Sequence, residues 1–169
     1  MLMDSWEIEC CQPPPGVGDV VAWRLRWLDA PDGPGRMTIP WRTTALRPAG
    51  DGEAAGLLLE RDGVTAWWPD PVVADLPPVG ELLAEAHVGV PEEVPATEGT
   101  VVAVHVVRHL YRRTARGFEP VAGTYTLRAV DRSPRWFDPG RDRSSLGEGG
   151  EPSSVRAESG VLVDLRIGA

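Results

Sequence analysis

The sequence contains neither lysine nor asparagine, and all seventeen of its basic residues are arginine. A bias toward GC-rich codons accounts for this pattern, and anion recognition by arginine is the functional alternative. The chain has no basic start followed by an apolar core of signal-peptide length, and no apolar run reaches the roughly 18 residues of a membrane span. We therefore expect a soluble, cytoplasmic protein without a membrane partner.

The sequence has only two cysteines, Cys10 and Cys11, and they are adjacent. Such a pair is not the disulfide framework of a small secreted domain, although a vicinal disulfide remains possible. Zinc ligands usually come in pairs at short spacings such as Cys-x-x-Cys, and no such pair is present. His105 and His109 lie four apart on a predicted strand, hence about 13 Å from one another. We predict no metal site; the weak candidates for a ligand are Cys10, Cys11 and His105.

Motifs of known catalytic chemistry are also absent. The sequence contains no Gly-x-Ser-x-Gly, no His-Glu-x-x-His and no phosphate-binding loop. A reactive cysteine needs a nearby cation or a helix N-terminus, whereas Glu7 and Glu9 precede Cys10. We assign no catalytic residue and no cofactor. A metal- or thiol-dependent enzyme at the cysteine pair stays open as the enzymatic alternative.

Glycine and proline, by contrast, are abundant, with nineteen and seventeen residues in a chain of 169. This composition favours many short strands and turns over long helices. The clearest strand covers residues 19–28, where four large apolar residues alternate with polar ones. These inward-facing residues are Val21, Trp23, Leu25 and Trp27.

Further strands follow from similar patterns. Alternation at residues 6–10 predicts a half-buried strand. Asp62-Gly63 suits a two-residue turn with positive φ, and therefore predicts a hairpin between residues 57–61 and 64–68. Longer strands are expected at residues 99–113, 124–130 and 161–167.

Two segments do not fit the strand pattern. Residues 80–87 are the only helical candidate, because Leu82, Leu83 and Ala86 share one face of a helix. Residues 133–160 are poor in aliphatic side chains, and we expect a long loop there that is at least partly mobile.

These elements add up to a single, mainly β domain over residues 1–169 with one short helix. Closure of the strands into a barrel protects sheet edges from unwanted pairing. We therefore predict a small closed or partly open β-barrel, SH3-like or OB-like, with a two-sheet β-sandwich as the alternative.

The N-terminal residues carry a resemblance to a known family. Trp6-x-x-Glu9-Cys10-Cys11, followed by Gly18-Asp19-x-Val21-x-Trp23, resembles a family of small uncharacterised actinobacterial proteins classed as a domain of unknown function. The match covers about the first thirty residues, and the family pattern has Gly where this chain has Gln12. The resemblance implies no activity, cofactor or site.

Charge is unevenly distributed along the chain, whose net charge is −8. Residues 48–100 carry one arginine and eleven acids, whereas residues 101–143 carry nine arginines and four acids. Such asymmetry can mark a basic patch for an anionic partner; the alternative is neutralisation of one segment by the other within the fold.

The arginine-rich segment supplies the candidate binding residues. Arginines interleaved with aromatics suit single-stranded nucleic acid, although Trp136 and Phe137 can equally anchor a loop to the core. We expect a non-enzymatic module that binds a protein partner or a second copy of itself, with nucleic-acid binding as the alternative. The candidate binding residues are Arg108, Arg112, Arg113, Arg116, Arg135, Trp136 and Phe137.

Overall fold

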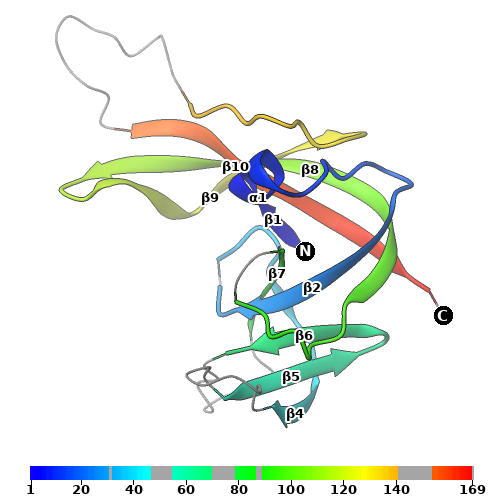
Figure 1. Cartoon of the computed structure of the whole chain (residues 1–169). Coiled ribbons are helices and arrows are strands. Elements are labelled where there is room, and N and C mark those ends of the chain that lie inside the picture. The colour runs from blue at the N-terminus through cyan, green and yellow to red at the C-terminus, as the bar shows by residue number, and fades with distance from the viewer. Residues whose placement is uncertain (31, 47–54, 70–78, 87–88, 141–153, 169) are drawn as a thin grey trace, which may run out of the picture.

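The computed structural model describes residues 1–30, 32–46, 55–69, 79–86, 89–140 and 154–168. In these ranges the chain forms ten strands and one short helix, which confirms the predicted mainly β class (Figure 1). In chain order the elements are β1 (Leu2–Asp4), α1 (Ser5–Cys10), β2 (Val20–Leu28), β3 (Met37–Thr38), β4 (Arg42–Leu46), β5 (Gly56–Arg61), β6 (Val64–Trp68), β7 (Val79–Glu85), β8 (Thr97–Thr114), β9 (Gly117–Val130) and β10 (Ser154–Ile167).

Five of the strands close into an uneven ring. β1 pairs with β7, β7 with β2, β2 with β8, β8 with β10, and β10 again with β1. The closing strand β1 is short: Leu2 lies beside Leu83 of β7, and Met3 lies beside Val161 of β10. This ring fits the predicted partly open barrel or sandwich rather than an even barrel.

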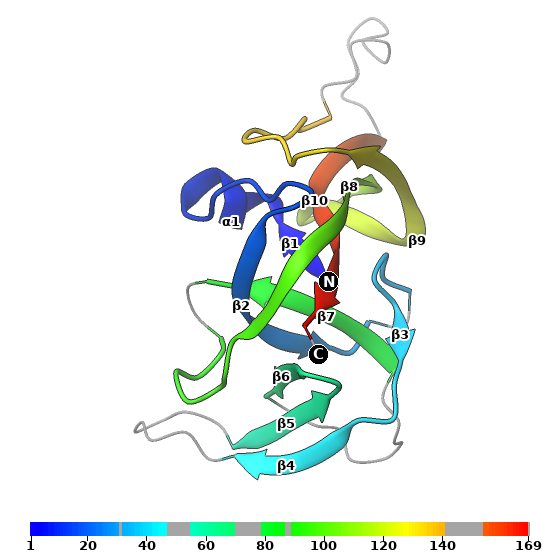
Figure 2. The same cartoon turned by 90° about the vertical axis from the view of Figure 1, so that its right-hand side faces the viewer.

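Two extensions leave the ring at opposite ends. β4, β5 and β6 form a small antiparallel sheet, which joins the ring where β6 runs parallel to β2 at Leu25 and Arg26. At the other end β8, β9 and β10 continue past the ring as a twisted three-stranded ribbon (Figure 2). The predicted hairpin between β5 and β6 is confirmed, and its turn residues Asp62 and Gly63 have φ values of 47° and 81°.

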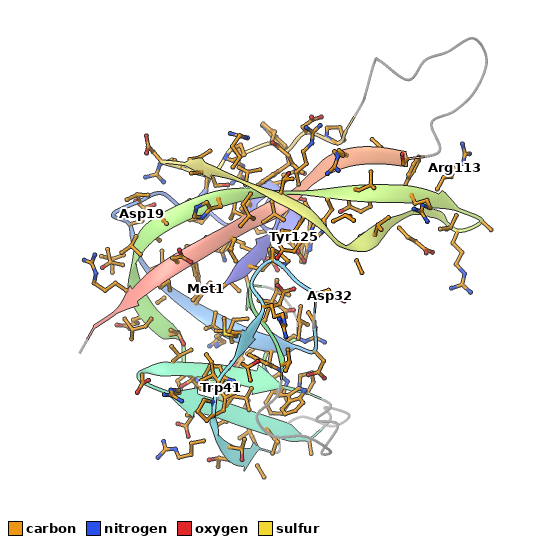
Figure 3. All side chains as sticks on the ribbon, turned by 180° about the vertical axis from the view of Figure 1, so that it is seen from behind. Met1, Asp19, Asp32, Trp41, Arg113 and Tyr125 are labelled. Carbon is orange, nitrogen blue, oxygen red and sulfur yellow. A yellow bond between two sulfur atoms is a disulfide. The ribbon has the colours of Figure 1, made fainter. Side chains whose placement is uncertain are left out.

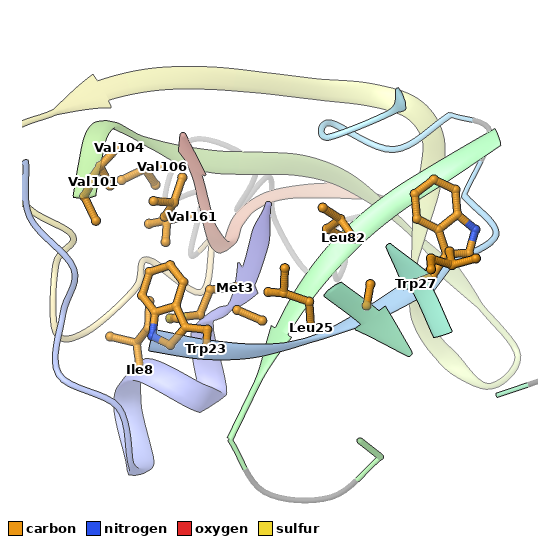
Figure 4. Close-up of a cluster of buried hydrophobic side chains, with 14 of the residues drawn as sticks. Met3, Ile8, Trp23, Leu25, Trp27, Leu82, Val101, Val104, Val106 and Val161 are labelled. Carbon is orange, nitrogen blue, oxygen red and sulfur yellow. The ribbon is translucent and has the colours of Figure 1, made fainter. Parts of the chain in front are cut away.

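The core lies inside the ring, between β2 and the valine-rich halves of β8 and β10 (Figure 4). Trp23, Leu25 and Trp27 are all buried, as the alternation in β2 predicts. The indole of Trp27 also meets Trp41 edge to face, with ring centroids 5.7 Å apart. The valines that pack opposite β2 are Val101, Val104, Val106, Val161 and Val163.

The strand predicted at residues 6–10 is wrong, because this segment lies in helix α1. Helical geometry buries the neighbours Glu7 and Ile8 together, whereas Trp6 is 51% exposed. Glu7 is held in place by the backbone, since its Oε1 accepts a hydrogen bond from the N–H of Ala86 at 3.4 Å. A six-residue alternation fits a strand and a short helix equally well, and these tertiary contacts decide between them.

The helix predicted at residues 80–87 is also wrong. This segment contains β7, which is hydrogen-bonded to β2 along one edge and to β1 or β3 along the other. Gly80 permits the close approach of β2, because a Cβ at this position would lie 2.8 Å from carbons of the Trp27 indole. Strand pairing on both edges overrides the helical propensity of Leu82, Leu83 and Ala86.

The loop predicted at residues 133–160 is shorter than expected. β10 already begins at Ser154 and pairs with β8 from Arg112 onward. Residues 133–140 form an irregular segment that runs beside β8 and β10 along the top of the view (Figure 1). Residues 141–153 lie outside the described ranges.

The carboxylate of Asp29 connects a tryptophan of β2 with a tryptophan of β6. Asp29 accepts hydrogen bonds from two buried indoles, from Trp27 Nε1 at 3.2 Å and from Trp68 Nε1 at 3.3 Å.

We expect Asp29→Ala to lower the free energy of unfolding by about 1–3 kcal/mol, because two indole N–H groups lose their acceptor. Asp29→Asn keeps one acceptor oxygen and should cost less. Urea unfolding measures both; Asp32→Ala, in the following loop, is the control, and an equal loss there would contradict the assignment.

Candidate functional site

Three of the predicted binding residues lie at the free end of the β8–β9 hairpin. Arg112, Arg113 and Arg116 are all exposed, and Figure 3 shows Arg113 far from the ring. The turn is closed by Thr114, whose Oγ1 accepts the N–H of Arg116 and donates to the carbonyl of Gly117, both at 3.1 Å. Because successive strand residues point to opposite faces, Arg112 and Arg113 place positive charge on both faces of the tip.

Arg108 lies further back on β8 and is engaged within the chain. Its Nε and Nη2 donate to the carbonyl of Arg156 at 3.3 and 3.1 Å, and Nη2 lies 3.6 Å from Asp138. Beside it, Arg128 of β9 pairs with Glu158 of β10 at 3.0 Å. These two arginines hold the ribbon together, and their charges are neutralised within the fold.

Residues 131–140, here called the strap, lie along residues 12–19, here called the anchor loop. Arg132 of the strap holds the carboxylate of Asp19 with two hydrogen bonds of 2.9 and 3.0 Å, and it also donates to the carbonyl of Pro14 at 2.7 Å. Backbone hydrogen bonds of 2.8 Å add to this contact. They run from Ser133 N to Pro15 O and from Val17 N to Asp131 O.

The other three predicted residues belong to the strap. Arg135 donates to the carbonyl of Gln12 at 2.9 Å, and the N–H of Phe137 donates to Glu9 Oε1 at 3.1 Å. Phe137 packs against the core, whereas Trp136 is 71% exposed. The predicted set is therefore divided between the hairpin tip, Arg108 further back on β8 and the strap near α1, and Trp136 is the exposed aromatic of the strap.

The arrangement around Arg132 also changes the acidity of its partner. The hydrogen bonds from the Arg132 guanidinium and from the N–H of Gly16 lower the pKa of Asp19 below its ordinary value. The exposed pair therefore stays charged over a wider pH range, and it keeps the strap on the anchor loop under mildly acidic conditions.

Three carboxylates that are buried or partly buried lie on β7 and on the neighbouring strand β1. Burial raises the pKa of Asp4, Glu81 and Glu85 above their ordinary values. Glu85 pairs with Arg26 at 3.2 Å, and Glu81 accepts the N–H of Gly35 at 3.0 Å, so both tie surface segments to β7. These contacts give the carboxylates structural roles.

The weak metal candidates do not come together. Cys10 and Cys11 are joined in a disulfide, and His105 is on β8, where it is one of the residues lining a separate surface hollow. Among the residues that the structure describes, no group of three or more His, Cys, Asp or Glu side chains could hold a metal ion.

The sequence does not reveal that β9 has an open edge. β9 pairs with β8, and no other strand in the described ranges pairs with its second edge. Residues 117–124 of this edge are interrupted by Pro120 and by a bulge near Gly123, which are common protections against unwanted pairing. Residues 125–130, here called the β9 edge, are in continuous register with residues 104–109, and residues 126–129 are all exposed.

A shallow hollow of about 340 Å³ adjoins the end of the β9 edge. It lies where the anchor loop, β8 and β9 meet, and its walls combine polar and apolar surface in about equal measure. Leu127, itself 42% exposed, lies two residues before Ala129 and on the same face of β9. The hollow is lined by Val17, Val102, Ala103, Val104, His105, Ala129, Val130 and Asp131.

Comparison with known proteins gives one match. The model of a family of unknown function (DUF6578) matches residues 1–167. No curated protein and no solved structure shows significant similarity to the chain. In the described ranges, no helix has the length and apolar character needed to cross a membrane.

The ion pair between Asp19 and Arg132 predicts a variant whose loss of stability depends on pH. Since the pKa of Asp19 is lowered in the folded state, its charge adds stability above the unfolded-state pKa, and this stability is lost as the pH falls through the folded-state pKa. We expect Asp19→Asn to be slightly less stable than wild type at pH 7, and the difference to shrink below about pH 4. Urea midpoints across this range test it. Asp131→Asn makes the same charge change in an exposed side chain; an identical pH profile there would contradict the role of Asp19.

Proposed function

The chain belongs to DUF6578, a family of unknown function, and we propose that it is a non-enzymatic binding module for an extended segment of a partner protein. The observation that carries the proposal is the β9 edge. An exposed strand with one unpaired edge offers backbone N–H and C=O groups to an incoming strand. Six residues in regular register give such a strand a defined place to pair.

Strand addition gives affinity through the main chain and specificity through alternate side chains. On the added strand, every second side chain points to the same face as Leu127 and Ala129. Both are exposed, and the hollow beside Ala129 has room for one apolar side chain. We therefore expect the partner segment to carry apolar residues at alternate positions.

The hairpin tip favours a partner with acidic residues at one end. Arg112, Arg113 and Arg116 lie beyond the β9 edge on the side away from the hollow, with Glu119 opposite Arg112. The net charge of −8 repels an acidic segment over most of the surface, so the tip orients it. A second copy of the chain, through its acidic residues 48–100, is the alternative partner of the same kind.

Proline variants test strand addition. Successive N–H groups of a strand point to opposite edges, so of Thr126 and Leu127 one bonds to β8 and the other faces the open edge. Proline removes the N–H, and the variant that loses less thermal stability identifies the outward residue. Peptides selected on the wild-type protein from a random twelve-residue phage library should bind this variant about tenfold more weakly or worse. Equal affinity for both proteins would overturn strand addition.

Charge reversal at the tip tests the orientation of the partner. Arg112→Glu with Arg116→Glu should weaken binding of selected acidic peptides roughly tenfold at low salt, and less at high salt, because exposed charges are screened. Arg42→Glu with Arg166→Glu makes the same charge change on two other exposed arginines and is the matched control. If both pairs weaken binding equally, the tip has no specific role.

The same proteins separate the alternatives. Sedimentation velocity over a wide concentration range will show dimers that the edge proline variant abolishes, if a second copy is the partner. Salt-sensitive binding of a fluorescein-labelled oligothymidine, lost on reversal of Arg112 and Arg116, would instead favour single-stranded nucleic acid. If the phage selection yields no binding peptide and one of these two results is observed, that alternative replaces the proposal.

A further inference from the structure

The Cys10–Cys11 disulfide lies at a junction between α1 and the anchor loop. Cys10 is the last residue of α1 and Cys11 is its C-cap; the N–H groups of Cys11 and Gln12 both donate to the carbonyl of Glu7, at 3.0 and 2.8 Å. Both cysteines are exposed. Exposed disulfides are accessible to attacking thiolates, and they are more often labile or regulatory than structural.

The disulfide also constrains the backbone. A bond between adjacent cysteines closes a ring of eight atoms that includes the intervening peptide, so it restricts ψ of Cys10 and φ of Cys11. These two angles set the direction in which the chain leaves α1 and enters the anchor loop. Reduction opens the ring and frees both angles.

Contacts with the strap lie directly on either side of this ring. Before it, Glu9 accepts the N–H of Phe137; after it, the carbonyls of Gln12 and Pro14 accept from Arg135 and Arg132. The relative position of these acceptors depends on the backbone between them. The ring therefore controls how well the strap can bond to both sides at once.

We infer that Cys10–Cys11 is a redox modification site that takes a dithiol reductant, and that its reduction loosens the strap from α1 and the anchor loop. This inference does not depend on the proposed binding function. It rests on the exposed disulfide and on the strap contacts that flank it.

In this thiol–disulfide exchange, the dithiol reductant supplies all the electrons and protons that the two cysteines take up. A thiolate of the dithiol attacks one sulfur of the pair, which forms a mixed disulfide and releases the other cysteine as a thiolate that takes up a proton. The second thiol of the reductant then displaces the first cysteine. Two electrons and two protons pass to Cys10 and Cys11, and the reductant becomes a disulfide.

Loosening of the strap has consequences beyond α1. The strap also carries Asp138, whose N–H donates to Glu158 Oε2 at 3.0 Å and whose carbonyl accepts the N–H of Glu158 at 2.9 Å. Asp138 lies near Arg108 as well. Reduction at α1 is therefore transmitted through one continuous segment to the β8–β10 ribbon.

Hydrogen exchange on the full chain tests the inference. The protein is equilibrated with oxidised or with reduced dithiothreitol, and the number of free thiols is counted by mass after alkylation. We expect no free thiol in the oxidised sample and two in the reduced one. Amides in peptides covering residues 131–140 should exchange roughly tenfold faster after reduction, the change expected when about one net hydrogen bond is lost. Amides of the β5–β6 hairpin should not change.

A double variant provides the control. Cys10→Ser with Cys11→Ser should show the fast exchange of the reduced protein in both buffers, while core peptides covering residues 101–107 stay protected. Two alkylated thiols in the oxidised sample, or equal strap exchange in oxidised and reduced wild type, would overturn the inference. The wild-type comparison alone decides the matter if the double variant does not fold.

Discussion

Strand β2 is the element that connects the parts of the sheet, because it is hydrogen-bonded to three other strands. Its first half pairs with β8, and its second half pairs with β7 on one edge and with β6 on the other. The same strand turns Trp23, Leu25 and Trp27 into the core. Because β2 joins the ring to the small β4–β6 sheet, its apolar face and both of its edges must be satisfied together. This requirement explains why its alternation is the clearest in the sequence.

The position of the arginines follows from a second constraint. A protein of net charge −8 has many acids that stabilise nearby cations, and the strap and ribbon use several arginines in this way. Arg108, Arg128 and Arg132 each make an ion pair, and Arg135 bonds to a backbone carbonyl. Three arginines of residues 101–143 are thus neutralised within the fold, but their partners Asp138, Glu158 and Asp19 lie outside the acidic segment 48–100. The exposed arginines of the hairpin tip, Arg112, Arg113 and Arg116, place further positive charge at the end of the ribbon.

Most of the fold was predictable where one local pattern decided the structure. The β5–β6 hairpin followed from Asp62-Gly63, and β2 and β8 followed from long apolar patterns. The errors fell on short segments whose state is set by distant partners. Residues 6–10 became helical with Glu7 buried against the backbone of Ala86, and β7 formed a strand because other strands pair with both of its edges. Neither contact is visible in a window of six to eight residues.

The candidate site was harder to predict because edges and contacts between distant segments leave little trace in composition. The alternation at residues 124–130 correctly predicted a strand. Whether one edge of that strand stays open depends on the positions of all the other strands, which a local pattern does not give. The cysteine pair presents the same difficulty. In the sequence Cys10 and Cys11 lack the neighbours that activate a thiol. In the fold they lie between Glu9 and Gln12, which both accept hydrogen bonds from the strap. In the redox site that we infer, thiol exchange at the exposed disulfide acts on the strap through the backbone that the disulfide constrains.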